Sequence, residues 1–280
     1  MYVKGEHADK VIIQLAPTGM IPTKDITPHV PVTADEIADD TYAAYQLGVS
    51  MVHVHARDEQ GLPTYRKEIF SEIFSKIREK CPDIIICAST SGRFHWNIEQ
   101  RAQVLDLKPE MATLSVGTVN FFDHPSINTP DDVQFLVRMM NALNIKPELE
   151  IFEAGFINTA RYLMKKGILK FPLHFNLLLG SLGSIPADIR DLVYLVESIP
   201  PGNTWSGAGI GRFQNQINAA SILMGGHVRT GIEDSLYMDD GQTKLATNKA
   251  LVERVVRIAG EFDREIATPE EARKILGIHS

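Results

Sequence analysis

The stretch MVHVHARD at residues 51–58 places two histidines two residues apart in an otherwise apolar run and follows them with Arg57 and Asp58. Side chains two apart on a β-strand point to the same face, so His53 and His55 would face the same point in space. A single buried histidine is more often a core residue with satisfied hydrogen bonds than a ligand. Two imidazoles on one face are costly to bury without a shared partner, and histidine is the commonest metal ligand. The pair therefore predicts a metal site, to which a neighbouring element would add a further ligand.

Carboxylates and hydroxyls follow several other apolar runs of the chain. Two histidines and one carboxylate are a usual set of protein ligands for a catalytic Zn²⁺, which keeps one position open for water or substrate. Taken alone, a serine or threonine at a strand end is more often bonded to backbone, and an acidic pair is as often a solvated helix start. The polar residues at these positions are Ser89, Thr90, Ser91, Gly92 and Arg93, then Thr113, Ser115 and Asn120, then Glu150 and Glu153, and finally Arg229, Glu233 and Asp234. The spacing leaves open which carboxylate completes the site.

Eight short apolar runs are the predicted strands that would position these side chains. Segments with helical spacing separate the runs, and capping signals begin some of them: Thr33 has Glu36 three residues on, and Thr129 precedes Pro130. Strands alternating with helices indicate a parallel sheet covered on both faces, and eight such units are what a TIM (β/α)₈ barrel requires. The runs cover residues 11–17, 51–56, 84–90, 111–117, 148–154, 174–180, 204–211 and 227–232.

No linker or change of composition divides the chain, so we expect residues 1–280 to form a single TIM-barrel domain. A doubly wound open sheet would also explain the alternation, and glycines dilute the strand pattern of the last two runs. Helices expected at 243–260 and after Thr268 would complete the outer ring. Active sites of TIM barrels lie at the carboxyl ends of the strands. The polar residues above would meet at that rim, whereas His174, at the start of its run, would be structural.

The composition, with 44% hydrophobic and 22% charged residues, is that of an ordinary globular protein. The net charge of −7 provides no basic surface for nucleic acid or an anionic membrane, so we expect small molecules or further copies of the chain as partners. The polar N-terminus leads into VIIQLAP without a long apolar segment, and a cytoplasmic location is the default expectation. Cys81 and Cys87 are too few for a disulfide scaffold and are expected to be reduced.

Several motifs together give the chain a resemblance to a known family. They are TG at 18–19, HVHARD at 53–58, STSG at 89–92, KPEMATLSVGTVNF at 108–121, PELEIFEAG at 147–155, AGIGR at 208–212 and GGHVRTGIED at 225–234. With these motifs the chain resembles the β-keto acid cleavage enzymes, typified by 3-keto-5-aminohexanoate cleavage enzyme, along almost its whole length. The resemblance implies a TIM barrel and a homo-oligomer, specifically a tetramer.

The resemblance also implies the residues of the site and their reaction. A Zn²⁺ would be held by His53, His55 and Glu233, the keto acid would be bound by Ser89, Gly92 and Thr113, and Arg229 and Asp234 would form a catalytic pair. The implied reaction exchanges acyl groups between a β-keto acid and acetyl-CoA, giving acetoacetate and a new acyl-CoA. The Zn²⁺ would chelate the 3-oxo group and the carboxylate. Asp234, paired with Arg229, would help to form the acetyl-CoA enolate, and because arginine is normally too basic to accept a proton, the sequence leaves open which of the two acts as base.

One position departs from the relatives that take an amino-bearing keto acid. Those relatives carry an acidic residue shortly after the Thr-Gly motif, where it can pair with the ammonium group, whereas TGMIPTKD places Ile21 there. Burying an ammonium group against isoleucine is costly, whereas an alkyl chain gains about 25 cal/mol per Å² buried. We therefore expect Ile21 to line the substrate pocket beside an uncharged, aliphatic part of the substrate tail, although Thr23 or Asp25 could restore polarity.

Other functions fit parts of this pattern. A metal-dependent hydrolase or aldolase could use the two histidines, but such hydrolases usually draw further histidines from later strands, and the fifth run here ends in FEAG. A non-catalytic acyl-CoA-binding barrel could hold a structural metal, but structural zinc sites are closed by four protein ligands. The segment WSGAGIGR lacks the full G-x-G-x-x-G spacing of a dinucleotide site, while its Arg212 could serve a phosphate or a carboxylate.

Overall fold

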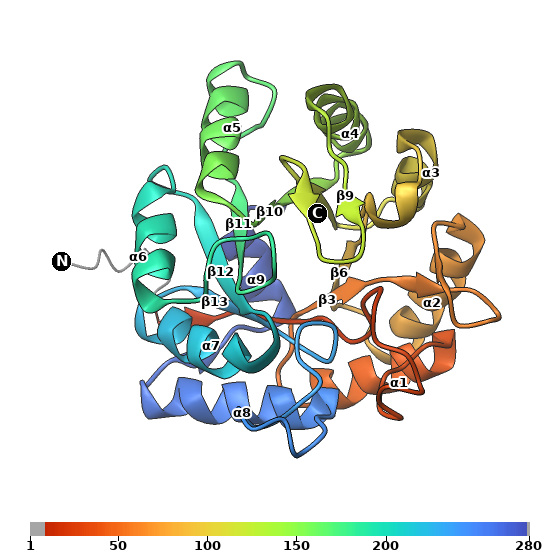
Figure 1. The fold of residues 1–280 in the computed structure, drawn as a ribbon, viewed down its shortest axis with the longest axis vertical. Coiled ribbons are helices and arrows are strands. Elements are labelled where there is room, and N and C mark those ends of the chain that lie inside the picture. Colours follow the sequence, from red (N-terminus) through yellow and green to blue (C-terminus); the bar gives the residue numbers. More distant parts are fainter. Residues whose placement is uncertain (1–8, 279–280) are drawn as a thin grey trace.

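A closed barrel of parallel strands forms the centre of the protein in a computed structural model that describes residues 9–278 (Figure 1). Each barrel strand lies within or overlaps one of the eight predicted runs, so the (β/α)₈ prediction is confirmed and the open-sheet alternative is wrong. Around the barrel the strands are β2 (Ile13–Leu15), β3 (Met51–Val54), β6 (Ile85–Ala88), β7 (Met111–Ser115), β10 (Lys146–Ile151), β11 (His174–Leu179), β12 (Thr204–Gly209) and β13 (His227–Thr230), which pairs with β2.

Helices surround the barrel and bury their apolar faces against it (Figure 1). Thr33 and Thr129 cap their helices as predicted. Each forms a capping box, which was predicted at Thr33 only: the threonine hydroxyl accepts from a backbone N–H and the side chain three residues on accepts in return. The ring consists of α1 (Ala34–Tyr45), α2 (Lys67–Lys80), α3 (Ile98–Ala102), α4 (Pro130–Leu143), α5 (Ala154–Lys165), α6 (Ile189–Ser198), α7 (Gln214–Leu223) and α8 (Asn248–Glu261), with 3₁₀ turns at Arg93–His95, Gln103–Leu107 and Gly211–Phe213.

The helix predicted over residues 243–260 begins later than expected, at Asn248. The carboxylate of Asp239 accepts hydrogen bonds from the backbone N–H groups of Thr243 and Lys244 and holds them in a turn. Thr247 then caps α8 by accepting from the N–H of Ala250. The apolar pattern thus begins before the helix does, because the side-chain hydrogen bonds of Asp239 hold the preceding residues in a turn.

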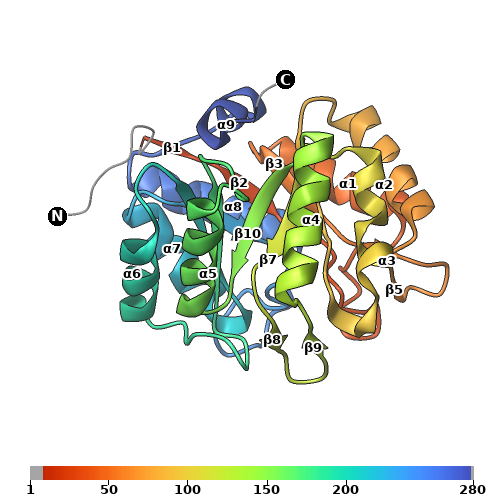
Figure 2. The same ribbon diagram turned by 90° about the horizontal axis from the view of Figure 1, so that it is seen from above.

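The last helix, α9 (Pro269–Leu276), closes the floor of the barrel, so the prediction that it completes the outer ring is wrong. Its Ile275 and Leu276 pack with Met51, Ile85 and Met111, which begin or lie near the start of the barrel strands. Figure 2 shows α9 at one end of the barrel and the hairpin of β8 (Val119–Asn120) and β9 (Pro125–Ser126) at the other. The floor is therefore apolar and sealed, and access is left to the opposite rim.

Short strands outside the barrel fasten its two ends. At the floor, β1 (Lys10–Val11) pairs in parallel with β14 (Glu265–Ile266). Buried Arg264 donates to the backbone carbonyls of Lys10, Ile222 and Gly226 and so ties β1 to the turn between α7 and β13. At the rim, β4 (Ala56–Arg57) pairs with β5 (Pro63–Thr64). Both cysteines are free and buried, as expected. Among residues 9–278 we find no helix long and apolar enough to cross a membrane; most of the polar N-terminus lies outside this range.

Candidate active site

A cavity of about 640 Å³ opens at the carboxyl ends of the barrel strands. The loops after every barrel strand contribute to its wall, and the predicted residues His55, Ser89, Arg229, Glu233 and Asp234 are among those that line it. This is the rim at which TIM barrels carry their active sites. The sequence-based placement of the polar strand ends at one rim agrees with this arrangement.

His55 and Glu233 line the cavity, and buried His53 lies beside them; these three residues form the candidate metal trio. The Nε2 atoms of His53 and His55 are 3.7 and 3.3 Å from Oε1 of Glu233, and the two rings meet edge to face. The three residues come together because β3 and β13 both flank β2 in the closed barrel. Their ligand atoms all lie within 4.8 Å of one another, which is close enough for a single ion to contact all three.

The electrostatics of this trio suit a cation. Burial holds the pKa of His53 well below its ordinary value, so its imidazole is neutral and able to ligate. Burial acts to raise the pKa of Glu233, but the charge of Arg229, together with the contact to His55, outweighs it and holds that pKa well below its usual range. The Oε2 atom of Glu233 is buried without a hydrogen-bond partner in the described part of the chain. An ionised carboxylate with an unpaired oxygen beside two imidazoles fits a divalent metal.

The loop after β2 brings the chain close to Glu233. Gly19 has a left-handed φ of +65°, and a Cβ atom there would lie 2.5 Å from Cγ of Glu233, so only glycine fits. Arg57 lies two residues after His55. It donates to the carbonyls of Gly19 and Pro22 at 3.0 and 2.8 Å. Arg57 thus fixes the loop that carries Ile21 and does not reach the metal trio. Asp58 accepts from the N–H groups of the next turn.

Arg229 joins the metal trio to Asp234. Its Nε and Nη2 atoms donate to the two oxygens of Asp234 at 2.9 Å each, and Nη2 also donates to Oε1 of Glu233 at 2.7 Å. Burial acts to lower the pKa of Arg229, but the two carboxylates outweigh it and hold that pKa well above its ordinary value. Burial raises the pKa of Asp234, and its ion pair with Arg229 opposes that rise. The guanidinium therefore stays charged, and the carboxylate is the group of the pair that can take up a proton.

The predicted substrate-binding residues are distributed unevenly. Ser89 and Ile21 line the cavity, and Ile21 is 41% exposed there. Thr113 is buried, and its hydroxyl accepts from the backbone N–H of Thr90 at 3.1 Å. Gly92 packs against helix α3, since a Cβ atom would lie 2.8 Å from the guanidinium of Arg101. Gly92 and Thr113 thus lie behind the wall that Ser89 forms and shape it from there.

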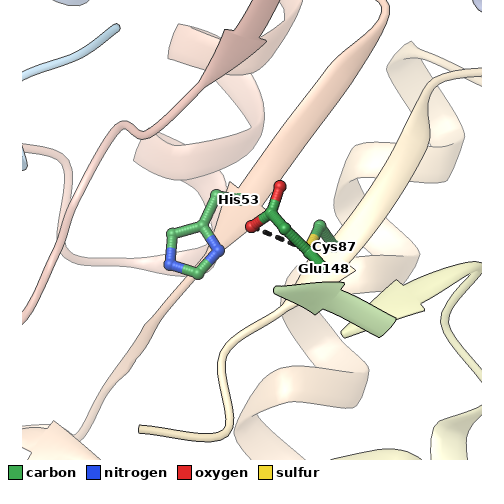
Figure 3. A group of neighbouring side chains, drawn as sticks. All are labelled: His53, Cys87 and Glu148. Atoms are coloured by element: carbon green, nitrogen blue, oxygen red, sulfur yellow. Dashed lines mark hydrogen bonds between the residues drawn. The ribbon is translucent and has the colours of Figure 1, made fainter. Parts of the chain in front are cut away.

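A polar layer lies beneath the metal trio, inside the barrel. Figure 3 shows the ring of His53 turned toward the side chains of Glu148 and Cys87, and the ligand atoms of these three also lie within 4.8 Å of one another. Glu148 accepts from Nε2 of Gln14 at 2.8 Å and from the thiol of Cys87 at 3.7 Å. Burial raises the pKa of Glu148 to about 7. This second group is enclosed by the barrel, and Glu148 already has two partners, so the trio with Glu233 is the better metal site.

Sequence reasoning did not single out Gln14 or Glu148 as part of the site. The signals were present, since Gln14 interrupts the apolar run VIIQLAP, and the alternation ELEI points both Glu148 and Glu150 inward. Glu150 is at the cavity wall, where it accepts from the hydroxyl of Ser115 at 2.6 Å. Arg93 also lines the cavity. The barrel register, which the sequence alone does not give, is what places these groups together.

Comparison with known proteins assigns the family. The family model for beta-keto acid cleavage enzymes matches residues 10–278. The chain belongs to this family. It is 45% identical over 271 residues to the 3-keto-5-aminohexanoate cleavage enzyme of Fusobacterium nucleatum subsp. nucleatum, covering 96% of this chain and 98% of that protein. It is 38% identical over 272 residues to the 3-oxoadipate:acetyl-CoA acetyltransferase of Cupriavidus necator, covering 96% and 95%. The resemblance seen in the motifs is therefore confirmed, and this family member is an enzyme.

Solved structures support the fold of this β-keto acid cleavage enzyme. The apo structure of ObcA matches with a TM-score of 0.76 at 20% identity, over 90% of this chain and 66% of that one. A ternary complex of ObcA with a C4-CoA adduct and oxalate matches with a TM-score of 0.80, over 89% and 68%. The chain thus spans about two thirds of ObcA. At this identity the likeness establishes the barrel fold.

Proposed function

We propose that this family member exchanges acyl groups between a β-keto acid and acetyl-CoA, giving acetoacetate and a new acyl-CoA, with Zn²⁺ as its metal. The observation that carries the proposal is the trio of His53, His55 and Glu233 at an open cavity, joined through Arg229 to Asp234. The name of the relative from Cupriavidus necator, an acetyl-CoA acetyltransferase, supports the same co-substrate. We also propose a homotetramer, as the resemblance implies, and a cytoplasmic location, as the sequence pattern favours.

His53, His55 and Glu233 would hold the Zn²⁺ through two imidazoles and one ionised carboxylate. When bound, the metal supplies a Lewis acid that polarises the 3-oxo group and the carboxylate of the keto acid. Within residues 9–278 the candidate ligand group consists of His53, His55 and Glu233 without a fourth member, which would leave a position for substrate. A structural zinc site is instead closed by four protein ligands. A non-catalytic barrel is thereby the weaker alternative.

Asp234 is the base in this proposal. A carboxylate can take a proton from C2 of the β-keto acid, whereas Arg229 stays charged beside two carboxylates. The bidentate contact from Arg229 orients Asp234, and the burial of both groups excludes water from the proton being moved. The enolate that leads to acetoacetate is that of the β-keto acid at C2, and not that of acetyl-CoA as expected from the resemblance, because cleavage of an adduct at the 3-oxo carbon would only return acetyl-CoA. C2 would add to the acetyl carbonyl of acetyl-CoA, and CoA would pass within the adduct from that carbon to the 3-oxo carbon. Cleavage of the bond between C2 and C3 would then release acetoacetate and the new acyl-CoA.

The test of the reaction is to mix the purified protein with acetyl-CoA and a panel of β-keto acids and to follow products by mass spectrometry. We expect acetoacetate together with a new acyl-CoA. Free acetate, or a decarboxylated ketone with acetyl-CoA untouched, would refute the proposal and favour the hydrolase or lyase alternatives.

The test of the metal site is elemental analysis, with about one Zn²⁺ expected per chain. Glu233→Ala should lose the metal. Glu150→Ala is the matched control, because Glu150 is a partly buried carboxylate of the same cavity that bonds to Ser115 instead. Loss of metal in the control with retention in Glu233→Ala would show that the third ligand is misassigned.

We further propose that the substrate tail is uncharged where it passes Ile21. This side chain is half-exposed on the cavity wall, and its position is held by the contacts of Arg57 to the loop. The test compares kcat/KM for 3-oxohexanoate and 5-amino-3-oxohexanoate in the wild type and in Ile21→Glu. A wild-type preference for the aminated acid, or an unchanged ratio in the variant, would contradict this assignment.

A further inference from the structure

Arg93 is a cation on the cavity wall that lacks an adequate partner. It lies in the loop after β6, next to the part of the wall formed by Ser89 and Ser91. Its side chain is only 15% exposed, and the guanidinium lies 4.4 Å from the ring centre of Phe121. The Nε atom is buried without a hydrogen-bond partner among residues 9–278. The nearest carboxylate oxygen, on Asp123, is 4.0 Å away on a side chain that is 56% exposed.

This arrangement differs from that of the other arginines of the cavity. Arg229 already has the two carboxylates of Asp234 and Glu233, and Arg212 is exposed to solvent. A guanidinium presents a planar set of N–H donors that matches a carboxylate, and a largely buried one is stabilised by such a partner. The aromatic ring of Phe121 fixes the plane of the Arg93 guanidinium without satisfying its donors. The wall therefore holds an oriented anion site.

We propose that Arg93 binds a second carboxylate at the far end of the β-keto acid, so that the substrate class is dicarboxylic 3-oxo acids. This inference rests on the proposed acyl exchange and deepens it. It agrees with the assignment of Ile21, since a methylene chain can pass the isoleucine before its terminal carboxylate reaches the arginine. Both residues oppose a substrate with an ammonium group, one by lacking a counter-charge and the other by repulsion.

A matched pair of substrates isolates the second carboxylate. 3-Oxoadipate and 3-oxohexanoate have the same carbon chain and differ only at the terminus, which is a carboxylate in one and a methyl group in the other. We expect the wild type to prefer 3-oxoadipate. In Arg93→Gln, kcat/KM for 3-oxoadipate should fall roughly 10- to 100-fold, mainly through KM, while kcat/KM for 3-oxohexanoate and KM for acetyl-CoA stay within about two-fold. Arg138→Gln, which removes an exposed charge from the outer helix α4, is the control.

The remaining outcomes separate this inference from the function on which it rests. If the wild type exchanges acyl groups with neither acid, the proposed function fails. If it prefers 3-oxohexanoate, or if Arg93→Gln impairs both acids equally, the carboxylate assignment alone is overturned. A raised KM for acetyl-CoA without a change for 3-oxoadipate would assign the anion to a CoA phosphate and also overturn it. If Arg93→Gln does not fold, the wild type alone tests the carboxylate assignment. Its kcat/KM for the terminal methyl ester of 3-oxoadipate should be roughly 10- to 100-fold lower than that for the free acid.

Discussion

His174 should make the stability of the barrel depend on pH. The residue begins β11 and is fully buried, with Nδ1 2.9 Å from the hydroxyl of Thr204 and Nε2 3.3 Å from that of Ser206. Burial, with a smaller contribution from the charge of Lys146, lowers the pKa of His174 from 6.5 to about 3. The unfolded chain therefore binds a proton below pH 6.5 that the folded chain refuses until about pH 3. The free energy of unfolding must decrease as the pH falls through this window.

The size of the effect follows from the shift. One pKa unit corresponds to about 1.4 kcal/mol, so the full shift is worth on the order of 5 kcal/mol, of which about 2 kcal/mol is lost between pH 7 and pH 5. The assay is denaturant unfolding at both pH values in the wild type and in His174→Gln, which lacks the titrating ring. We expect the decrease between pH 7 and pH 5 to be about 2 kcal/mol smaller in the variant.

Other buried groups also titrate, so the comparison between variants isolates this histidine. His124→Gln is the control, because that imidazole is exposed on the rim loop between β8 and β9. The reasoning would be refuted if the wild type and His174→Gln lost the same free energy between the two pH values, because His174 would then take up its proton within the folded barrel.

Further predictions concern catalysis, packing and the metal. Asp234→Asn should keep the metal and lose most turnover, since it changes a proton-transfer group without removing a ligand; full activity by the acetyl-CoA assay would contradict the role. Gly117→Ala would place a Cβ atom 2.4 Å from the ring of Phe156 and should cost roughly 1–3 kcal/mol in denaturant unfolding, whereas Gly155→Ala, with open space around its Cβ, should not. Arg264→Ala should lower the free energy of unfolding by roughly 1–3 kcal/mol because it leaves buried carbonyls unpaired; an unchanged midpoint would exclude that role. Chelation should lower the thermal midpoint and Zn²⁺ should restore it; a midpoint insensitive to both would argue against the metal.

The barrel strands were predictable because each is a short apolar run between turn or helix signals. Even β12, with its dilute TWSGAG pattern, forms as expected, and the structure gives a reason for its glycines. A Cβ atom at Gly207 would lie 2.0 Å from the hydroxyl of Ser221 on α7, so the absent side chain allows that helix to approach. The position of α9 was harder to predict, because the capping box at Thr268 marks where the helix begins but not what its apolar face contacts.

The histidine pair of the metal trio was accessible to sequence reasoning, because strand parity places His53 and His55 on one face. The choice of Glu233 among the nearby carboxylates came from the resemblance to the family. Gln14 and Glu148 were not accessible in either way, since their hydrogen bond joins residues 134 positions apart across the barrel interior. Arg93 was visible as a polar residue after a strand, but its lack of a partner depends on where Asp123 and Phe121 lie. Local patterns thus identify the groups, whereas their partners follow from the register of distant strands.

The sealed floor bears on how such an enzyme can change over generations. The packing of α9 against Met51, Ile85 and Met111 anchors the strands at the end remote from the cavity. A duplicated gene could therefore accumulate substitutions in the rim loops, at positions such as Ile21 and Arg93, without disturbing the residues that hold the barrel shut. Two relatives that are 45% and 38% identical to this chain are named for different keto acids. A change of substrate without loss of the barrel is what this separation of roles would allow.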